Sequence, residues 1–340
     1  MSVPGPPRNV YVLELAGQED AFAVAEAATA TSDVSPVAAG LATARGLADG
    51  VETLAFTHRA SDLFGTTDAT IESAVALLEA ASLDRTGTVA VRARDVRGTT
   101  AVDTQAVERA LGQVLVDRGF SVDLDEPDHV LRALFAGADD ASAADSGADG
   151  VCALGWLAVE TDRAFADRQP TDRPFFQPGS MDPQLARALV NLAGAEPEKT
   201  ILDPMCGTGG LLLEAGRVGA TPVGGDAQTK MVRGTRENLR ELLDGVWHVY
   251  RGDAARVPIV TDAVDGVVFD APYGRQSKIE GDLDELVADA LAEARRIASR
   301  AVVVGDRSWA ETAESVGWTV EATFERRVHR SLTRYIAVLR

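Results

Sequence analysis

The stretch that decides the fold reads TILDPMCGTGGLLLEAGRV, residues 200–218. An apolar run ends at Asp203, glycines follow at Gly207 and Gly209, and apolar residues at helical spacing begin at Leu211. We therefore expect a buried strand, a tight turn and then a helix over 211–218 whose N-terminus faces a ligand. Ligands bind at the carboxyl ends of strands in open α/β sheets, so the turn marks a pocket.

Strand-like and helix-like segments alternate regularly on both sides of this turn. Such alternation predicts a Rossmann-like parallel sheet with helices on both faces, and the two β-like runs at the end predict a hairpin that places an antiparallel strand in that sheet. The expected strands are Thr200–Asp203, Pro222–Asp226, Val246–Tyr250, Gly266–Asp270, Ala301–Gly305, Thr319–Arg327 and Thr333–Leu339.

The first half also alternates, and 340 residues are too many for one ordinary core. Its expected strands are Asn9–Leu15, Thr53–Thr57, Thr88–Arg94, Val130–Phe135 and Val151–Val159, and its expected helices are Asp20–Ala28, Asp68–Ala81 and Thr104–Arg118. Residues 161–173 are polar and contain Pro170, so we interpret them as a linker into the second half.

A glycine-rich turn alone could serve several nucleotides or only the fold. The spacing Gly-x-Gly-Gly departs from the dinucleotide pattern, and the absence of a following Gly-Lys-Ser/Thr excludes an ordinary P-loop. Asp203, Asp226 and Asp253 follow three successive strands. A carboxylate at Asp226 can accept bonds from ribose hydroxyls, and one at Asp253 can hold an adenine amino group. Together they indicate an adenosine cofactor, against the alternative of ordinary surface aspartates.

Asp270-Ala271-Pro272-Tyr273 ends another buried strand and resembles the Asp/Asn-Pro-Pro-Tyr motif of methyltransferases that modify planar amines. The resemblance implies S-adenosylmethionine as cofactor. It also implies that Asp270 and the Ala271 carbonyl accept the two amine N–H groups, while Tyr273 stacks on a base that has left its stack. Catalysis would then be mostly positioning. Ala271 replaces the first proline of the motif, which keeps the carbonyl but removes backbone stiffness.

Charge is the unusual feature of the composition. The net charge is −19, with thirty arginines but only three lysines, which favours a halophilic origin over a merely acidic protein. Acidic chains normally do not bind nucleic acid. However, residues 1–173 carry a net −15 and residues 174–340 only −4, so a basic face can exist in the second half.

Other classes of protein find little support in the composition. No apolar run could span a bilayer, and residues 1–7 do not resemble a signal peptide, so a cytoplasmic protein without membrane contact is expected. The two cysteines and four histidines lack metal-ligand spacing, so no metal is expected.

The segment RPFFQPGSM, residues 173–181, resembles Arg-Pro-Phe-Phe-His-Pro-Gly-Ser of the archaeal tRNA guanosine-10 N2-methyltransferases in their halophile form, with Gln177 in place of the histidine. This resemblance implies methylation of the exocyclic N2 amine of guanosine 10 in tRNA, once or twice. It also implies that the segment covers the cofactor and that a helix over 183–192 packs on the sheet. The cofactor-binding residues it implies are Asp203, Pro204, Cys206, Gly207, Gly209, Asp226, Asp253 and Ser180; the catalytic ones are Asp270, Ala271, Pro272 and Tyr273.

The first half resembles a THUMP domain preceded by a small ferredoxin-like domain. VDLDEPD, residues 122–128, resembles the THUMP segment Val-Asp-Leu-x-x-Pro-Asp. The resemblance implies an α/β THUMP domain that binds the acceptor end of tRNA, in a protein expected to be a monomer. The expected divisions are 1–50 ferredoxin-like, 51–160 THUMP, 161–173 linker and 174–340 class I methyltransferase. Candidate phosphate contacts are Arg92, Arg94 and Arg97, although solvated arginines are an equal alternative.

Other functions stay open at this point. The same chemistry could act on ribosomal RNA, on another tRNA site or on N6 of adenine, and a non-catalytic RNA-binding protein or chaperone could retain the fold. A basic group around the last hairpin could touch RNA or pair with helix carboxylates; it consists of Arg326, Arg327, Arg330 and Arg334.

Overall fold

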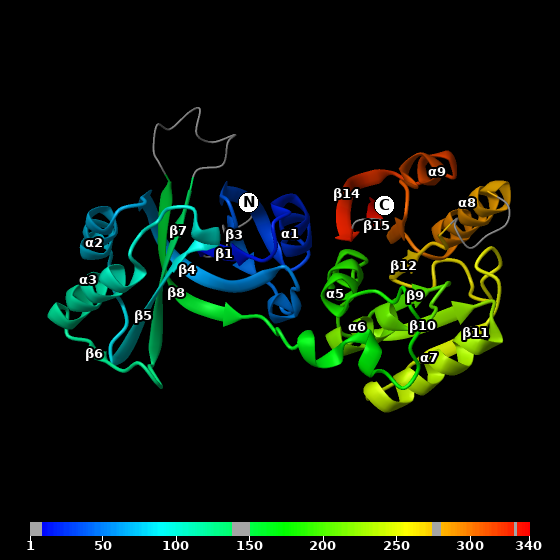
Figure 1. The fold of residues 1–340 in the computed structure, drawn as a ribbon, viewed down its shortest axis with the longest axis horizontal. Helices are drawn as coiled ribbons and strands as arrows, with labels where there is room; N and C mark the ends of the chain where they lie inside the picture. The colour runs from blue at the N-terminus through cyan, green and yellow to red at the C-terminus, as the bar shows by residue number, and fades with distance from the viewer. Residues whose placement is uncertain (1–8, 138–149, 274–279, 330–331) are drawn as a thin grey trace, which may run out of the picture. The chain divides into compact units, whose positions relative to one another are not determined.

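A computed structural model describes residues 9–137, 150–273, 280–329 and 332–340 (Figure 1). The chain divides into two compact units, Met1–Asp162 and Arg163–Arg340. Two features used above, the opening residues 1–7 and Arg330, lie outside the described residues.

The second unit contains a seven-stranded sheet in the order β11-β10-β9-β12-β13-β15-β14. The first five of these strands are parallel, and β15 runs antiparallel to both of its neighbours, which confirms the predicted Rossmann-like sheet with an antiparallel final strand. The strands are β9 (Thr200–Asp203), β10 (Thr221–Asp226), β11 (His248–Arg251), β12 (Gly266–Asp270), β13 (Ala301–Gly305), β14 (Val320–His329) and β15 (Leu332–Leu339).

Helices bury both faces of this sheet. Val267 and Phe269 of β12 pack in a cluster with α8 and α9, while Val268, which points to the opposite face, is also fully buried. A second cluster joins α6 and α7 to β11. Continuous apolar strands are the signature of a sheet covered on both faces. The helices are α5 (Pro183–Leu192), α6 (Gly210–Val218), α7 (Thr229–Leu242), α8 (Glu280–Ile297) and α9 (Ala310–Ser315).

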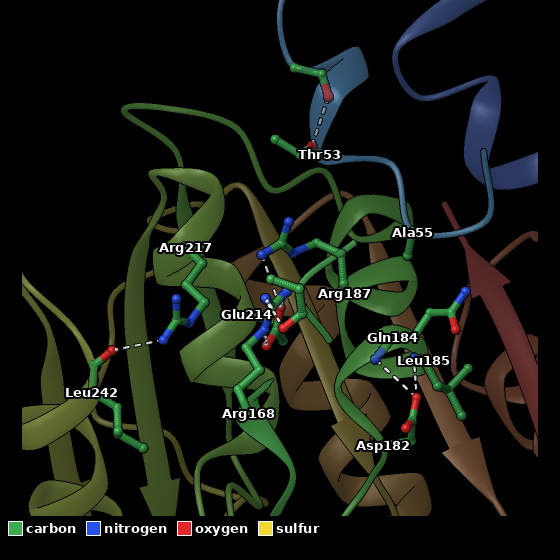
Figure 2. A network of polar contacts seen from close by, with 12 residues as sticks. Thr53, Ala55, Arg168, Asp182, Gln184, Leu185, Arg187, Glu214, Arg217 and Leu242 are labelled. Carbon is green, nitrogen blue, oxygen red and sulfur yellow. Dashed lines mark hydrogen bonds and ion pairs between the residues drawn. The ribbon is translucent and has the colours of Figure 1, made fainter. Parts of the chain in front are cut away.

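A buried ion network ties α5 and α6 to the segment before them. Glu214 of α6 is 1% exposed and lies 2.9 Å from both Arg168 and Arg187. Figure 2 shows the side chains of both arginines directed toward Glu214. Asp182 caps α5 by accepting the backbone N–H groups of Gln184 and Leu185. Breaking a buried ion pair by removing one partner costs about 3–5 kcal/mol. The network therefore fixes the helix that starts at the glycine-rich turn.

The first unit is built around an eight-stranded sheet in the order β2-β3-β1-β4-β8-β7-β5-β6. Residue 50 is the expected boundary between the ferredoxin-like and THUMP regions, and strands that precede it in the sequence share this sheet with strands that follow it. Its strands are β1 (Val10–Leu15), β2 (Thr31–Ala38), β3 (Leu41–Leu47), β4 (Thr57–Asp68), β5 (Thr88–Asp95), β6 (Ser121–Val122), β7 (His129–Ala136) and β8 (Val151–Glu160); its α-helices are α1 (Asp20–Ala27), α2 (Ile71–Ala80) and α3 (Thr104–Asp117).

The predicted strand Thr53–Thr57 is wrong. Val51–Thr53 forms a short 3₁₀ helix, and the strand begins only at Thr57 and continues to Asp68. The following helix therefore begins at Ile71, after the Thr70 hydroxyl accepts the backbone N–H of Ser73 at 3.1 Å, and not at Asp68. The hairpin of β2 and β3 was not predicted, because β2 contains Pro36 and β3 contains two alanines and a glycine, residues that give little β signal.

Candidate active site

The glycine-rich turn after β9 is held by hydrogen bonds to the backbone. Gly207 and Gly209 adopt φ values of 51° and 80°, which residues other than glycine rarely adopt. The Gly207 N–H donates to Asp226 Oδ2 at 3.1 Å, and the Cys206 N–H donates to the Gly225 carbonyl at 2.9 Å. Asp203 accepts the N–H of Met205 at 3.0 Å. The next strand of the sheet therefore shapes the turn.

Helix α7 completes the support of this turn. The Thr235 hydroxyl donates to the Gly207 carbonyl at 2.7 Å, and the Asn238 amide donates to the Thr208 carbonyl at 2.9 Å. A Cβ atom on Gly209 would lie 2.8 Å from Thr235 Cγ2. Both the φ angle and the crowding therefore require glycine at position 209.

A cavity of about 200 Å³ opens beside the turn. The RPFFQPGSM segment covers part of it, and the Ser180 hydroxyl lies 3.1 Å from that of Thr208. The residues around the cavity are Gln177, Pro178, Gly179, Ser180, Met181, Asp203, Met205, Cys206, Gly207, Thr208, Gly210, Leu211, Met231 and Asp270.

The structure brings five of the predicted site residues to this cavity: Ser180, Asp203, Cys206, Gly207 and Asp270. Pro204, Gly209 and Asp226 do not line the cavity. Pro204 is buried, Gly209 belongs to the turn, and Asp226 accepts a hydrogen bond from the turn at Gly207. Both carboxylate oxygens of Asp226 accept backbone N–H groups, from Gly207 and Gln228. A carboxylate has about four acceptor positions, so capacity for ribose hydroxyls remains.

Asp253 does not line the cavity. It is exposed and accepts the N–H of Ala255 at 3.0 Å, which stabilises a local turn. Its predicted contact with adenine stays a prediction. Cys206 is 5% exposed, and burial raises the pKa of its thiol well above the ordinary value, as expected for a packing residue and not a nucleophile.

On the target side, Asp270, Tyr273 and Arg334 form a hydrogen-bonded chain. The Tyr273 hydroxyl donates to the two carboxylate oxygens of Asp270 at 3.0 and 3.1 Å. Arg334 Nε donates to the same hydroxyl at 3.0 Å, and Arg334 Nη2 lies 3.5 Å from Asp270 Oδ2. Asp270 and Tyr273 are thus joined directly, in addition to their predicted contacts with a ligand.

Burial dominates the electrostatics of the site. It raises the pKa of Asp203 well above its usual range, and the nearby carboxylates of Asp226 and Asp270 raise it further. Burial likewise raises the pKa of Asp270 to about 6, although Arg334 and the Tyr273 hydroxyl act to lower it. Asp270 is therefore ionised at neutral pH, as an acceptor of amine N–H groups must be.

Ala271 compensates for the proline that it replaces. Its N–H donates to the carbonyl of Val304 at 2.8 Å, which extends the ladder between β12 and β13. Proline has no N–H and could not make this bond. Ala271 is 2% exposed, and Pro272 after it is exposed. The strand ladder thus fixes the backbone on the N–H side of residue 271.

Arg334 was not assigned to the site from the sequence. It was grouped with the basic residues of the last hairpin, but it is only 3% exposed. The register of β15 in the structure shows its place, because Tyr335 pairs with Gly305, the last residue of β13. Arg334 therefore lies at the edge of the sheet where the parallel strands end.

The three arginines proposed to bind RNA have partners within the first unit. Arg92 Nη2 donates to the Leu124 carbonyl at 2.6 Å, Arg94 lies 3.2 Å from Glu14, and both terminal nitrogens of Arg97 donate to the carboxylate of Asp20. Their phosphate contacts stay a prediction. In the described part of the chain no cluster of His, Cys, Asp or Glu could hold a metal, and no helix there is long and apolar enough to cross a membrane.

Comparison with known proteins places the chain in a family. Residues 170–336 match the family model described as RMKL-like, methyltransferase domain (UPF0020). The chain is 36% identical to the tRNA (guanine(10)-N2)-dimethyltransferase of Methanothermobacter thermautotrophicus over 74% of its own length and 72% of that protein, and 31% identical to the enzyme of the same name from Pyrococcus abyssi over 74% of each chain. The crystal structure of TrmN from Thermus thermophilus aligns with 97% of the chain at 22% identity and a TM-score of 0.48. The chain belongs to the tRNA (guanine(10)-N2)-dimethyltransferase family.

Proposed function

We propose that this protein methylates the exocyclic N2 amine of guanosine 10 in tRNA, first once and then a second time, with S-adenosylmethionine as methyl donor. The observation that carries the proposal is the shared cavity: Asp270 of the target motif lines the same space as Asp203 and Ser180 of the cofactor side. A methyl donor and an amine acceptor must meet within reach of each other for a direct transfer. The names of the relatives give the base and the position.

The cavity residues suit the cofactor. Gly207 and Gly210 line the cavity at the start of α6, and Asp203 and Asp226 place carboxylates beside the turn. Ser180, from the segment that covers the cavity, lies next to Thr208 of the turn. Bound S-adenosylmethionine supplies an activated methyl group on a sulfonium.

The residues of the target motif orient the amine. Asp270 accepts one N–H of the N2 amine and the Ala271 carbonyl accepts the other, which directs the nitrogen lone pair at the methyl group. The proton that nitrogen loses after transfer passes to Asp270 or to water, and a pKa of about 6 suits a carboxylate for this role. For a second transfer one N–H remains, and Asp270 holds it.

The protein is proposed to act as a cytoplasmic monomer. We assign the first unit to a THUMP region that receives the acceptor end of tRNA, with the divisions at residues 50 and 160 as part of the proposal. The charge of −15 over residues 1–173, which include this unit, opposes phosphate binding, so binding there relies on shape and stacking more than on ion pairing.

The test is incubation of unmodified tRNA transcripts with the enzyme and S-adenosylmethionine in concentrated potassium chloride, followed by nucleoside mass spectrometry. We expect N2-methylguanosine early and N2,N2-dimethylguanosine late, with Asp270→Asn as the inactive control. Parallel reactions contain ribosomal RNA and adenine-rich DNA. Methylation of either of these in preference to tRNA would overturn the proposed substrate.

A further inference from the structure

Arg334 is a buried cation at the edge of the sheet. β15 runs antiparallel to β13, and Tyr335 pairs with Gly305 at the carboxyl end of that strand. Arg334 therefore lies on the side of β13 that faces away from β12. Its side chain reaches past the end of β13 to Asp270, the last residue of β12. A guanidinium that is 3% exposed loses most of its hydration, so it needs compensating partners.

Within the described residues, the polar contacts of the Arg334 guanidinium lie in the candidate active site. Nε donates to the Tyr273 hydroxyl at 3.0 Å, Nη2 donates to the Gly179 carbonyl at 3.4 Å, and Nη2 lies 3.5 Å from Asp270 Oδ2. Gly179 lies in the segment over the cofactor cavity, while Tyr273 and Asp270 form the target motif. One side chain thus joins the two halves of the site.

The charges around Asp270 give this contact a chemical consequence. Asp306, just after β13, repels a charge on Asp270 and raises its pKa, and Asp203 at the end of β9 is close enough for the two carboxylates to influence each other. Burial raises the pKa of Asp270 further. Two groups oppose these effects: the Tyr273 hydroxyl, which is neutral, and Arg334, which carries a positive charge.

We propose that Arg334 is a positioning residue for methyl transfer: it keeps the Asp270 carboxylate charged and holds Tyr273 in place, so that the incoming guanine amine finds an ionised acceptor. This inference rests on the proposed function and adds a residue to its site. The Tyr273 hydroxyl donates to both carboxylate oxygens of Asp270, the same oxygens that would accept the amine. The amine replaces that hydroxyl, and Arg334 remains as the counter-charge of the carboxylate.

Two variants separate charge from packing. Arg334→Met removes the charge and keeps an apolar stem, whereas Arg334→Lys keeps the charge but loses the planar fork that reaches Tyr273. The matched control is Arg340→Gln: Arg340 directly follows β15, is exposed and pairs only at the surface with Glu321, 2.9 Å away. Circular dichroism and thermal unfolding of all three identify any variant that fails to fold.

The first readout is the pH dependence of kcat/KM for tRNA at saturating S-adenosylmethionine, which reports the pKa values of the enzyme before tRNA binds. For the parent enzyme the acid limb lies near pH 6, the pKa of Asp270. Loss of a neighbouring opposite charge raises a carboxylate pKa by about 1–3 units, so in Arg334→Met the limb moves upward by that amount. Arg334→Lys and Arg340→Gln keep the limb within about half a unit of the parent, since both retain the charge at position 334. The KM for S-adenosylmethionine changes much less than kcat in Arg334→Met.

The second readout needs no RNA. Carboxyl-¹³C-labelled aspartate, observed by NMR in the parent and in Asp270→Asn, isolates the titration of Asp270 by difference. We expect this titration to shift upward in Arg334→Met. An unchanged Asp270 titration in folded Arg334→Met overturns the role of Arg334, even if the enzyme methylates tRNA. If no RNA is methylated but the titration shifts, the proposed function fails while the electrostatic role of Arg334 stands.

Discussion

The two sides of the candidate active site are built differently. On the cofactor side, backbone groups carry the geometry: Gly207 and Gly209 bend the turn, and Asp226 and Asn238 hold it through main-chain N–H and carbonyl groups. On the target side, the side chains of Asp270, Tyr273 and Arg334 hold one another. The backbone hydrogen bonds that shape the turn need not break when a ligand binds. The hydrogen bond between Tyr273 and Asp270, in contrast, must break before a ligand can use the same carboxylate oxygens. Substitutions should therefore damage binding on the first side and turnover on the second.

The largest effect is expected for Asp270→Asn. The amide keeps the shape but loses the charge, and its NH₂ group faces the donor N–H groups of the substrate. Misplaced reactants can cost about 100-fold, so we expect kcat to fall by at least that factor. Steady-state methyl transfer measures it, with calorimetry to show that S-adenosylmethionine still binds.

The matched control for this change is Asp262→Asn, at an exposed position with φ of 54° that asparagine tolerates. Its kcat should equal that of the parent. A large loss of cofactor affinity in Asp270→Asn would break the contrast between the two sides.

A smaller effect, on the other side, is expected for Gly209→Ala. The methyl group meets Thr235 Cγ2 at 2.8 Å, and a left-handed conformation costs a non-glycine residue roughly 1–2 kcal/mol. We expect affinity for S-adenosylmethionine, measured by calorimetry, to fall by about tenfold while kcat at saturation changes less.

Gly245→Ala controls for the backbone angle, because Gly245 has φ of 101° and no atom within 4 Å of a built Cβ. Affinity in this variant should be unchanged. Equal losses in both variants would show that the crowding at Thr235 is not what requires glycine.

The smallest effect is expected for Tyr273→Phe, which keeps the ring and removes the hydroxyl. The hydroxyl lowers the pKa of Asp270 in the enzyme without tRNA, so its loss moves the acid limb of kcat/KM for tRNA above pH 6. Above pH 8 the carboxylate is ionised in both proteins, and kcat should differ by only a few-fold. Tyr273→Ala also removes the proposed stacking, worth roughly 1–3 kcal/mol, and should raise the KM for tRNA. A Tyr273→Phe enzyme with an unchanged acid limb would contradict the coupling between these residues.

The sequence predicted the second unit more closely than the first for physical reasons. β9, β12 and β13 have the predicted bounds, because apolar strands that end in Asp or Gly leave little freedom in where they stop. In the first unit β2 contains Pro36, and β3 contains Ala42, Ala44 and Gly46, so neither has a clear strand signal. Tertiary pairing with β1, and not propensity, makes β3 a strand.

In the candidate site, too, some residues could be predicted from the sequence and one could not. Asp203, Cys206, Gly207 and Asp270 could be predicted because they follow strands within recognisable motifs. Arg334 could not, because it lies 64 residues after Asp270 in a segment whose arginines resemble a surface group. Only the antiparallel register of β15 brings it to the site. Position along the chain gives no sign of such a contact.

The most direct test of the account uses tRNA transcripts that differ only at position 10. Guanosine, inosine and adenosine at that position present an N2 amine, no exocyclic amine and an N6 amine. Methyl transfer from labelled S-adenosylmethionine is then measured for each transcript at the same concentration. We predict transfer to the guanosine transcript alone, reaching two methyl groups per tRNA at completion. Equal transfer to the inosine transcript would contradict the assignment of Asp270 and Ala271 to the N2 amine of guanosine 10.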